Sequence, residues 1–533
     1  MQTPAAYAAL HHADTPIRLI ETHVSWVFLT GRYAYKVKKP LRLSFLDYST
    51  AARRAALCRE ELRLNLRYAR ELYVDVVPIG GTPSAPRVGT HEEVFEHALR
   101  MVQFDPSLEL GELLRHGVVG TGEIAKFGAE LAAMHASAER AQPGGEHGQP
   151  ERTHRVTLAN FDELGRAVAG ADGARRGGTP SGGKCADDLT PARLDATRAH
   201  VEAMFAHVRP LMQRRWLSAC VRECHGDLHC GNVVRWQGRL VAFDGLEFDP
   251  ALRFIDVASD LAFLTMDLAV HGRTDLRAAL LDAWTAAGGD YEAVALLPYY
   301  EPYRALVRAK VAALRGDRTA SVREAAQRDA KLYLDWATRD SARATPALVV
   351  MIGLSGSGKT WLARRLAFAG DALHLRSDVE RKRLAGLGPL DDSRSPADGG
   401  LYTPEFGERT YTRLRECARS CLSGGQNVVL DAANLRRHER AAFVALAQEQ
   451  QARVRFVHCV APLATLRKRI AMRRADASDA SEATVELLDR QPGYWEPLSP
   501  EEVARTLVVD TTDARDIERA IADIVQHCRP ALS

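Results

Sequence analysis

The sequence has no strong excess of charge of either sign. Lys and Arg together number 71 and Asp and Glu 68, which leaves a formal net charge of +3. A balanced total gives no sign of nucleic acid or an anionic membrane surface as the main partner. No apolar run reaches the roughly 18 residues that a membrane span needs. The first residues also lack the basic and apolar regions of a secretory signal. We therefore expect a cytoplasmic protein without a membrane partner.

Cysteine is also scarce. The nine cysteines are scattered and odd in number, which suits reduced thiols better than a disulfide framework. The densest group is Cys220, Cys224, His225, His229 and Cys230, but its spacing matches no common zinc pattern. This disfavours a structural metal at that segment.

The length of 533 residues is too great for a single core and predicts two to four domains. Asp340–Pro346 is short, polar and ends in proline, which indicates a boundary. We therefore predict domains at 1–343 and 344–533. Within the first, Gln142–Pro150 and Gly170–Gly183 are rich in Gly, Pro and polar residues, which predicts flexible loops or insertions.

A phosphate-loop motif, G-x-x-x-x-G-K-[ST], occupies Gly353–Thr360. Ala347–Ile352 before it predicts a buried strand and Trp361–Phe368 after it a helix, which is the context the motif needs. Backbone N–H groups of such a loop bind phosphate oxygens, Lys359 neutralises the outer phosphates, and the Thr360 hydroxyl ligates Mg²⁺. The alternative is a purely structural glycine turn. The predicted nucleotide ligands are Gly353, Ser355, Gly356, Ser357, Gly358, Lys359 and Thr360.

Beyond the loop, predicted strands alternate with helices, which indicates a parallel sheet covered by helices. Asp431 follows the apolar strand Val428–Leu430, as a Walker-B-like acid does, and we predict that it holds Mg²⁺ through water. Asp378 follows the strand Ala372–Leu375, and the carboxyl ends of such strands are where substrates bind.

This half resembles phosphotransferases of the gluconate kinase, polynucleotide kinase and zeta-toxin type. In that family an acid at this place faces the acceptor hydroxyl, which implies Asp378 as general base and Arg376 or Arg381 as a substrate anchor. The alternative for Asp378 is a helix N-cap.

The basic segment Leu466–Arg474 resembles the R-I-x-x-R lid helix of nucleoside monophosphate kinases. Arg469 and Arg473, at positions i and i+4, share one helix face, and the resemblance implies that both reach the transferring phosphoryl group. The alternative is a solvated basic face.

The chain opens with short strands at Ile17–Ile20, Trp26–Thr30 and Tyr33–Val37, an antiparallel start. Lys36 ends the alternating stretch Tyr33-Ala34-Tyr35 within the last strand, with Lys38 and Lys39 close behind. Lys36 is either a solvated strand end or a lysine that reaches phosphates. A helix is expected from about Ala51 to Glu71, and it carries the adjacent Glu60 and Glu61.

A second segment with several potentially catalytic side chains is His225–Asn232. The segment contains an acid, Asp227, and an amide five residues later, Asn232; a second acid, Asp244, ends the next strand. This order is typical of sites in which one carboxylate contacts a nucleophilic hydroxyl and two oxygen ligands bind Mg²⁺. The alternative is a polar β-hairpin.

The segment matches every fixed position of the H-G-D-x-H-x-x-N loop of aminoglycoside phosphotransferases and choline kinases, a branch of the protein-kinase-like fold. The resemblance covers roughly residues 15–340. It implies that Asp227 is the catalytic base and that Asn232 and Asp244 are metal ligands. Asp256 and Asp260 resemble the structural acids that brace this loop.

The same resemblance implies that Lys36 binds the α- and β-phosphates, with Glu61 or Glu60 as its helix partner. Lys38 lies on the same strand face, so the choice between the two lysines stays open. Backbone groups from Met101 to Gln103 are expected to hold adenine. One departure is that Glu21–Ser25 contains no glycine, so the G-x-G-x-x-G of protein kinases is absent.

We expect two domains of α/β and α+β class: a bilobal protein-kinase-like fold, then a P-loop parallel sheet with a lid. The whole chain resembles proteins described as bifunctional aminoglycoside phosphotransferase and ATP-binding proteins. This implies two ATP- and Mg-dependent modules that phosphorylate a hydroxyl of small-molecule acceptors. Aminoglycosides are polycations, however, and Leu280–Trp336 has no concentrated acidic stretch to bind them.

Two alternatives remain open. In the first, the protein is regulatory and one module only senses nucleotide. In the second, the C-terminal module phosphorylates nucleic-acid ends. All predicted catalytic groups are present, which favours chemistry in both halves. The near-neutral total disfavours a nucleic-acid track. The acceptors, the coupling between the modules and the oligomeric state are not legible in the sequence.

Overall fold

The computed structural model describes residues 17–43, 46–175, 191–314, 320–338, 345–395, 399–476 and 479–529. The chain divides into two compact units. Unit 1 comprises Met1–Val119, Met134–Thr153 and Gln213–Asp267, and unit 2 comprises Gly120–Ala133, His154–Met212 and Leu268–Ser533. This division groups helices before residue 343 with the C-terminal sheet, so the domain boundary between residues 343 and 344 stays a prediction.

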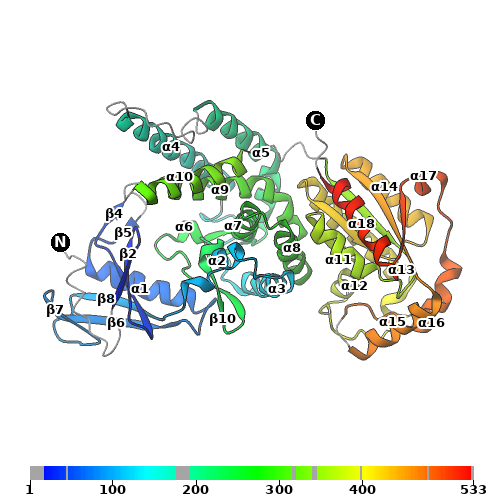
Figure 1. The fold of residues 1–533 in the computed structure, drawn as a ribbon, viewed down its shortest axis with the longest axis horizontal. Helices are drawn as coiled ribbons and strands as arrows, with labels where there is room; N and C mark the ends of the chain where they lie inside the picture. Colours follow the sequence, from blue (N-terminus) through cyan, green and yellow to red (C-terminus); the bar gives the residue numbers. More distant parts are fainter. Residues whose placement is uncertain are drawn as a thin grey trace. The chain divides into compact units, whose positions relative to one another are not determined.

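Unit 1 begins with a six-stranded antiparallel sheet (Figure 1) in the order β1-β2-β3-β8-β6-β7. The predicted antiparallel start is confirmed: β2 pairs with β3, and Val27 faces Lys36 across the ladder. Its strands are β1 (Arg18–Glu21), β2 (Ser25–Leu29), β3 (Tyr33–Lys38), β6 (Tyr73–Thr82), β7 (Ala85–Val88) and β8 (Glu96–Val102).

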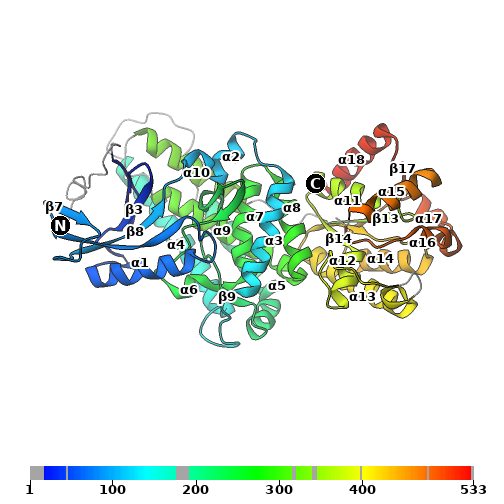
Figure 2. The same cartoon turned by 90° about the horizontal axis from the view of Figure 1, so that it is seen from below.

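Helix α1 (Ala51–Asn65) packs on this sheet against β6 and β8, as Figure 2 shows. The Thr50 side chain caps it by accepting a hydrogen bond from the Arg53 N–H, which satisfies one of the open donors of the first turn. The helix ends before Glu71, where prediction had extended it, because the chain turns after Asn65.

Short elements complete unit 1 and bring its polar loops together. The hairpin of β10 (Val233–Trp236) and β11 (Arg239–Ala242) sets Phe243 beside Asn232, whose carbonyl accepts the Phe243 N–H at 2.9 Å. The residues on either side of this hairpin, Asn232 and Asp244, are the two predicted metal ligands. The others are β4 (Arg42–Leu43), β5 (Leu46–Asp47), β9 (Val221–Glu223), β12 (Phe254–Asp256), α2 (Leu110–Arg115) and α6 (Pro250–Arg253).

Four helices cross the division between the units, and three others belong to unit 2. The crossing helices are α3 (Thr121–Ser137), α4 (Pro150–Arg175), α5 (Pro191–Leu217) and α7 (Val257–Val270). Those of unit 2 are α8 (Thr274–Gly288), α9 (Leu297–Leu314) and α10 (Ala320–Ala337). Helix α4 corrects one prediction, because it continues through residues 170–175, where a flexible loop was expected. Residues 176–183 of that segment lie outside the described residues.

The C-terminal part of unit 2 is built on a five-stranded parallel sheet in the order β14-β15-β13-β16-β17. This confirms the predicted class, a parallel α/β sheet that follows an antiparallel one. Every residue of β13 is buried, as expected for a strand covered on both faces. The strands are β13 (Ala347–Ile352), β14 (Ala372–Arg376), β15 (Asn427–Asp431), β16 (Arg453–Val460) and β17 (Thr506–Asp510).

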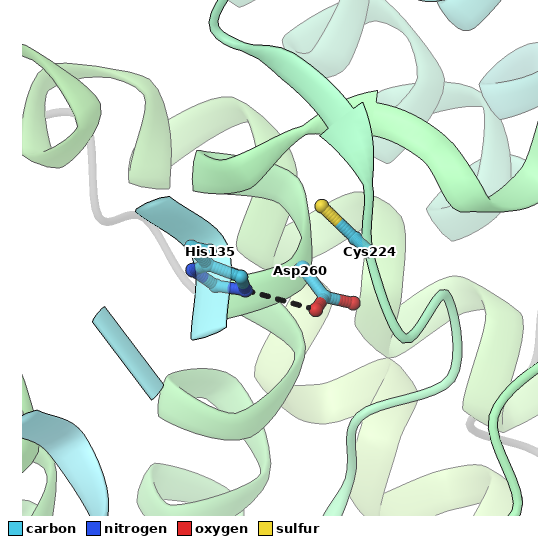
Figure 3. Close-up of side chains that lie close together, drawn as sticks. All are labelled: His135, Cys224 and Asp260. Atoms are coloured by element: carbon cyan, nitrogen blue, oxygen red, sulfur yellow. Dashed lines mark hydrogen bonds and ion pairs between the residues drawn. The ribbon is translucent and has the colours of Figure 1, made fainter. Parts of the chain in front are cut away.

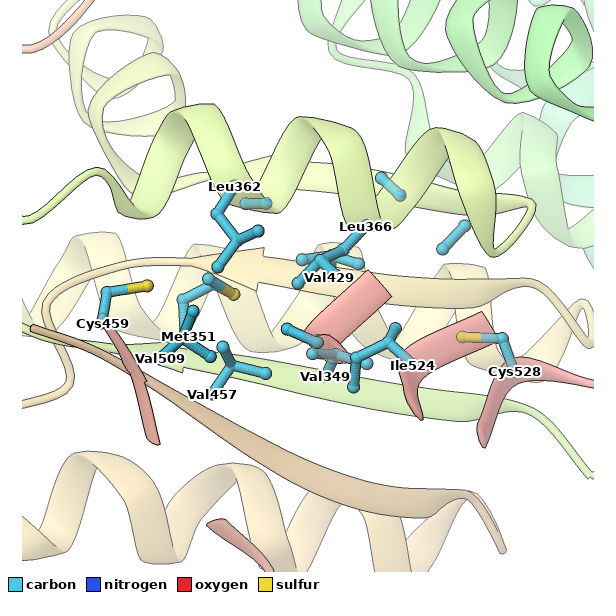
Figure 4. Packing of buried hydrophobic residues seen from close by; sticks show 14 of the residues in the cluster. Val349, Met351, Leu362, Leu366, Val429, Val457, Cys459, Val509, Ile524 and Cys528 are labelled. Carbon is cyan, nitrogen blue, oxygen red and sulfur yellow. The ribbon is translucent and has the colours of Figure 1, made fainter. Parts of the chain in front are cut away.

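Helices cover both faces of this sheet. Figure 2 shows α11 and α18 on one side and α13 and α14 on the other. Figure 4 shows Leu362 of α11 and Ile524 of α18 packed over Val349 and Met351 of β13. The helices are α11 (Lys359–Ala369), α12 (Ser377–Leu384), α13 (Pro404–Ser423), α14 (Arg437–Glu449), α15 (Leu463–Asp476), α16 (Val485–Arg490), α17 (Pro500–Val503) and α18 (Ala514–Cys528). Among the described residues, none of the helices combines the length and apolarity that crossing a lipid bilayer requires.

Within unit 2, polar side chains join the segment around α8 to the C-terminal sheet. Arg277 of α8 lies 2.9 Å from Asp371 and 3.1 Å from Glu301, and its side chain is nearly buried. The Tyr291 hydroxyl donates to Oε1 of Glu380 on α12 at 3.1 Å. Glu380 has no exposed surface, so this donor partly replaces the water that the carboxylate loses on burial.

Candidate functional site

Lys36 of β3 lies at the centre of an ion-pair cluster in unit 1, in which Glu61 is buried and the Asp244 side chain is 42% exposed. Its Nζ is 2.8 Å from Oε1 of Glu61 on α1 and 2.5 Å from Oδ1 of Asp244, which follows β11. Packing of α1 on the sheet turns Glu61 toward the strand lysine. The structure thus brings together the predicted strand lysine, the predicted helix glutamate and one predicted metal ligand.

Lys38, two residues along the same strand face, is held in the same way. Its Nζ lies 2.7 Å from Oε2 of Glu61, and it also forms an ion pair with Glu247, which accepts the Tyr48 hydroxyl. Sequence reasoning missed Glu247 and Tyr48. The sequence did contain a signal for them. Lys38 lies two residues after Lys36 on the same face of a buried strand, and a second buried lysine requires a second carboxylate. We call the following set the lysine cluster: Lys36, Lys38, Tyr48, Glu61, Asp244 and Glu247.

Glu60 has a different environment, although it adjoins Glu61 in the sequence. Its carboxylate pairs with Arg63 at 2.8 Å and with Arg253 at 2.6 Å. Successive helical residues point in directions about 100° apart, so only one of the two glutamates can face the lysines. That residue is Glu61.

The charges of the lysine cluster hold one another in the ionised form. Burial alone would raise the pKa of Glu61, but the ammonium groups of Lys36 and Lys38 lower it to about 2. Burial would likewise lower the pKa of each lysine, and the facing carboxylates instead raise both well above their usual value. Glu61 and the two lysines therefore stay charged at neutral pH.

Asp227 and Asn232 face each other across the turn that follows β9. The Asn232 Nδ2 donates to the carbonyl of Asp227 at 2.9 Å and to its Oδ2 at 3.1 Å. Nε2 of His229 lies 3.6 Å from the same Oδ2. Asn232 is buried, whereas the Asp227 side chain is 39% exposed. The predicted base is therefore accessible and its amide neighbour is fixed.

Asp260 braces this turn from behind. Its two oxygens accept the backbone N–H groups of Gly226 at 2.9 Å and His225 at 3.1 Å. Figure 3 shows His135 bonded to the same carboxylate at 3.1 Å, with Cys224 nearby. The ligand atoms of His135, Cys224 and Asp260 lie within 4.8 Å of one another. Because both Asp260 oxygens already accept loop N–H groups, we assign them to the brace.

Asp244 has an unusual backbone. Its φ of +62° lies in the left-handed region, which costs a non-glycine residue roughly 1–2 kcal/mol. The Tyr73 hydroxyl accepts the Asp244 N–H, and Asn65 Oδ1 accepts the Gly245 N–H, both at 2.9 Å. Strained backbone that neighbours hold in place is common at functional sites.

The segment predicted to hold adenine ends β8. Met101 is buried and belongs to an apolar cluster with Ala34 and Val241. Gln103 contacts the turn between β2 and β3: its Oε1 accepts the Gly31 N–H at 2.9 Å. Adenine binding by Met101 and Gln103 stays a prediction.

In unit 2, the phosphate loop joins β13 to α11. Gly353, Gly356 and Gly358 have φ of +146°, +77° and +85°. A Cβ at Gly353 would lie 2.6 Å from the Cys459 carbonyl oxygen, and one at Gly356 would lie 2.6 Å from that of Leu466. Side chains are therefore excluded, and the loop backbone keeps the conformation that glycine permits.

Asp431 is buried in this centre and Lys359 is partly buried beside it. Burial lowers the pKa of Lys359, while Asp431 opposes the shift. Burial would raise the pKa of Asp431, but a hydrogen bond from His374 and the charge of Arg376 hold it below its usual range. Nε2 of His374 lies 3.2 Å from Oδ2 of Asp431. Sequence reasoning missed His374, because a histidine within a buried strand carries no motif.

Two arginines were predicted as alternative substrate anchors beside Asp378. Arg376 is already paired, with Asp479 at 2.9 Å and Asp431 at 3.8 Å. Arg381 instead donates to the Leu401 carbonyl at 2.9 Å, and its guanidinium lies 5.0 Å from the centre of the Tyr402 ring. In the described part of the chain no carboxylate pairs with Arg381, so it is the arginine available to a ligand.

The two lid arginines on α15 differ in their contacts. Arg469 donates to Thr511 Oγ1 at 2.8 Å and to the Gly356 carbonyl at 3.4 Å, so it touches the phosphate loop itself. Among the described residues, Arg473 makes one hydrogen bond, a long one to the Ala483 carbonyl at 3.5 Å. Arg469 is therefore anchored, and Arg473 is much less restrained.

These side chains line one cavity of about 1030 Å³. The volume lies at the upper end of the range for small-molecule sites, about 300–1,000 Å³. Of the predicted nucleotide ligands, Gly353 and Ser357 do not line it, and Ser357 is buried. The predicted residues that do are Ser355, Gly356, Gly358, Lys359, Thr360, Asp378, Arg381, Asp431, Arg469 and Arg473.

Comparisons with known proteins cover both units. A family model described as an AAA domain matches residues 348–498. The chain is similar to an uncharacterised protein of Mycobacterium tuberculosis strain H37Rv, 29% identical over 487 residues, 91% of this chain and 92% of that one. Similar solved structures include a sugar kinase from Janibacter sp. HTCC2649, with 24% identity, a TM-score of 0.27 and coverage of 34% of this chain and 98% of that chain. Another is a choline/ethanolamine kinase family protein from Mesorhizobium loti, with 12% identity, a TM-score of 0.33 and coverage of 61% and 92%.

Proposed function

We propose that the protein is an ATP- and Mg-dependent phosphotransferase with two kinase modules, each of which transfers a phosphoryl group to a hydroxyl of a small-molecule acceptor. One observation carries the proposal: Lys359, Asp378 and Asp431 line a single cavity together with the phosphate loop. A phosphate cradle, a candidate base and a buried acid are the parts that phosphoryl transfer requires.

The residues of the C-terminal centre fit a nucleotide phosphate and a metal ion. Gly353, Gly356 and Gly358 keep the positive-φ backbone that a phosphate loop needs, and Lys359 offers a cation in the same cavity. Thr360 and Asp431 would hold Mg²⁺, which when bound neutralises charge on the phosphates. Asp378 accepts the proton of the acceptor hydroxyl. Arg473, which is little restrained, stabilises the charge that develops on the phosphoryl group.

The N-terminal centre supports the same reaction by different residues. Lys36 binds nucleotide phosphates, and Glu61 fixes the direction of its side chain. Asp227 orients the acceptor hydroxyl and takes its proton, while the Asn232 amide holds the Asp227 carboxylate in place. Asn232 and Asp244 would hold the metal ion, which neutralises phosphate charge when bound.

Two substitutions test the proposal in the full-length protein. Asp227→Asn removes one base and Lys359→Ala removes one phosphate contact. Each is assayed for ATP turnover across a panel of sugars, aminoglycosides, nucleosides and RNA ends. We expect each to abolish a different activity. Asp75→Asn and Lys331→Ala are matched surface controls, since these residues pair with Arg100 and Asp335.

If both variants leave every activity unchanged, the proposal is wrong. The number of ATP-analogue molecules bound per chain in the presence of Mg²⁺ separates the remaining cases. A value near two supports two nucleotide sites. A value near one that Lys359→Ala abolishes restricts nucleotide binding to the C-terminal module and contradicts the two-module form.

A further inference from the structure

Part of the lining of the phosphate-loop cavity is rich in arginine. This part comes from α12, α13 and the residue that precedes α14. Arg381 follows Asp378 by three residues on α12, so both lie on one helix face. On α13, Glu408, Tyr411 and Arg415 follow the same helical spacing and line the cavity. We call the following set the arginine wall: Arg381, Glu408, Tyr411, Arg415 and Arg436.

None of the three arginines of this wall has a carboxylate partner within the described ranges. Arg381 donates to the Leu401 carbonyl, and its Nε is buried without a hydrogen-bond partner. Arg415 donates to the Thr412 hydroxyl at 3.0 Å on its own helix. Arg436 lies 5.4 Å from the centre of the Tyr494 ring. Two other arginines of α13 are paired with carboxylates, Arg413 with Glu380 and Arg419 with Glu449, whereas Arg409 lies over the Phe406 ring.

The carboxylates that line the same cavity are mostly committed elsewhere. Asp431 is bonded to His374, Asp479 is paired with Arg376, and Glu439 accepts the N–H that begins α14. Apart from the proposed base Asp378, this leaves Glu408 as the carboxylate that shares the lining with the three guanidinium groups. The wall therefore carries an uncompensated positive charge beside the proposed base.

We propose that the acceptor of the C-terminal centre carries an anionic group, phosphate or carboxylate, in addition to the hydroxyl that is phosphorylated, and that Arg381 and Arg415 bind it. This rests on the proposed function and specifies its substrate class. Planar guanidinium groups suit both anions, because they bind two oxygens in parallel. A polycationic acceptor such as an aminoglycoside would be repelled at this wall.

The test measures anion binding after the nucleotide position has been filled. The full-length protein is saturated with a non-hydrolysable ATP analogue and Mg²⁺, and inorganic phosphate is then titrated by calorimetry. Acetate is titrated in parallel to distinguish a phosphate from a carboxylate preference. We expect saturable binding of at least one of the two anions, weakened about tenfold or more in the Arg381→Gln/Arg415→Gln double variant.

Arg419→Gln is the matched control, because Arg419 lies one turn further along α13 and pairs with Glu449 at 2.8 Å. It should leave anion binding unchanged. The melting temperature and the stoichiometry of analogue binding verify that each variant is folded. If the double variant does not fold, Arg415→Gln alone decides.

Two results overturn the inference: no saturable anion binding in the analogue-loaded protein, or anion binding that the double variant leaves unchanged. Either result leaves the proposed kinase function standing as long as analogue binding depends on Lys359. Loss of that dependence instead contradicts the proposed function itself. The two failures are therefore distinguishable in one series of titrations.

Discussion

Nε2 of His374 on β14 lies 3.2 Å from Oδ2 of Asp431 at the end of β15, and both side chains are buried. The two strands are parallel neighbours, so the imidazole reaches the carboxylate from the adjacent strand. The contact fixes the direction of the acid that we propose as a metal ligand. Partners of metal ligands commonly contribute to metal affinity.

Replacement of His374 tests this positioning role. His374→Ala should weaken Mg²⁺-dependent nucleotide binding by about 10–100-fold, because Asp431 loses the donor that orients it. His374→Gln can still present an N–H and should restore most of the affinity. Titration of Mg²⁺ at a fixed nucleotide-analogue concentration gives both values. Equal affinities for the Ala variant and the wild type would contradict the role.

Lys38 should be mainly structural, in contrast to its neighbour in the sequence. Lys38→Met leaves two buried carboxylates, Glu61 and Glu247, short of a cation, and breaking such a pair costs about 3–5 kcal/mol. Lys39→Met is the matched control, because Lys39 pairs with the exposed Glu21, and such pairs contribute about 1 kcal/mol or less. Thermal unfolding should show a large decrease in melting temperature for the Lys38 variant alone. Similar decreases for both would disprove the buried role.

Glu61 should contribute to the stability of unit 1 in acid. Its pKa is lowered from 4.5 to about 2, so its stabilising charge is complete above pH 4.5 and is lost as the pH falls toward 2. The melting temperature of Glu61→Gln should therefore fall less steeply than that of the wild type over this range. Glu92→Gln, at an exposed position, is the control. Parallel curves for Glu61→Gln and the wild type would exclude the contribution.

Asp244 can be altered in charge or in backbone preference. Asp244→Asn keeps a residue that tolerates the left-handed region but removes the carboxylate. It should therefore abolish the N-terminal activity while shifting the melting temperature little. Asp244→Ala should abolish the same activity and cost roughly 1 kcal/mol more in stability. Activity assays and thermal unfolding separate the two effects, and an active Asn variant would refute the metal-ligand role.

Substitution of the two lid arginines should affect different properties of the C-terminal activity. Arg473→Ala should lower kcat of the C-terminal activity by about 10²-fold or more and leave nucleotide affinity nearly unchanged, because the single hydrogen bond of Arg473 to the described residues is long. Arg469→Ala removes a contact to the Gly356 carbonyl and should also weaken nucleotide binding. Steady-state kinetics and analogue binding distinguish these outcomes. Identical behaviour of the two variants would show that our division of roles is wrong.

The sequence was sufficient for features that depend on local patterns. The phosphate loop needs glycine at fixed positions and follows a buried apolar strand, and the parallel sheet follows from alternating strands and helices. Both sheets were predicted with the correct class for these reasons. The antiparallel start was predicted from the alternation in Tyr33–Val37 and the adjacent turn.

Features that depend on tertiary packing were not accessible in the same way. The choice between Glu60 and Glu61 requires the rotation of α1 on its sheet, and the burial of Lys38 requires Glu247, which is 209 residues away. Arg376 and Arg381 look equivalent in sequence, yet only the fold brings Asp479 to the former. The loop expected at residues 170–175 was wrong because α4 continues through that glycine-containing segment.

The polar contacts around α8 bear on any attempt to separate the two halves of the chain. A fragment starting at residue 344 would lose the Tyr291 hydroxyl that serves Glu380, which sits two residues after Asp378 on the same helix. It would also lose Arg277, the partner of Asp371. In such a fragment Glu380 on α12 would lack the hydroxyl group that donates to it. A loss of activity on truncation would therefore show that α12 needs its neighbours in the preceding segment. It would not show that the removed segment contains catalytic residues.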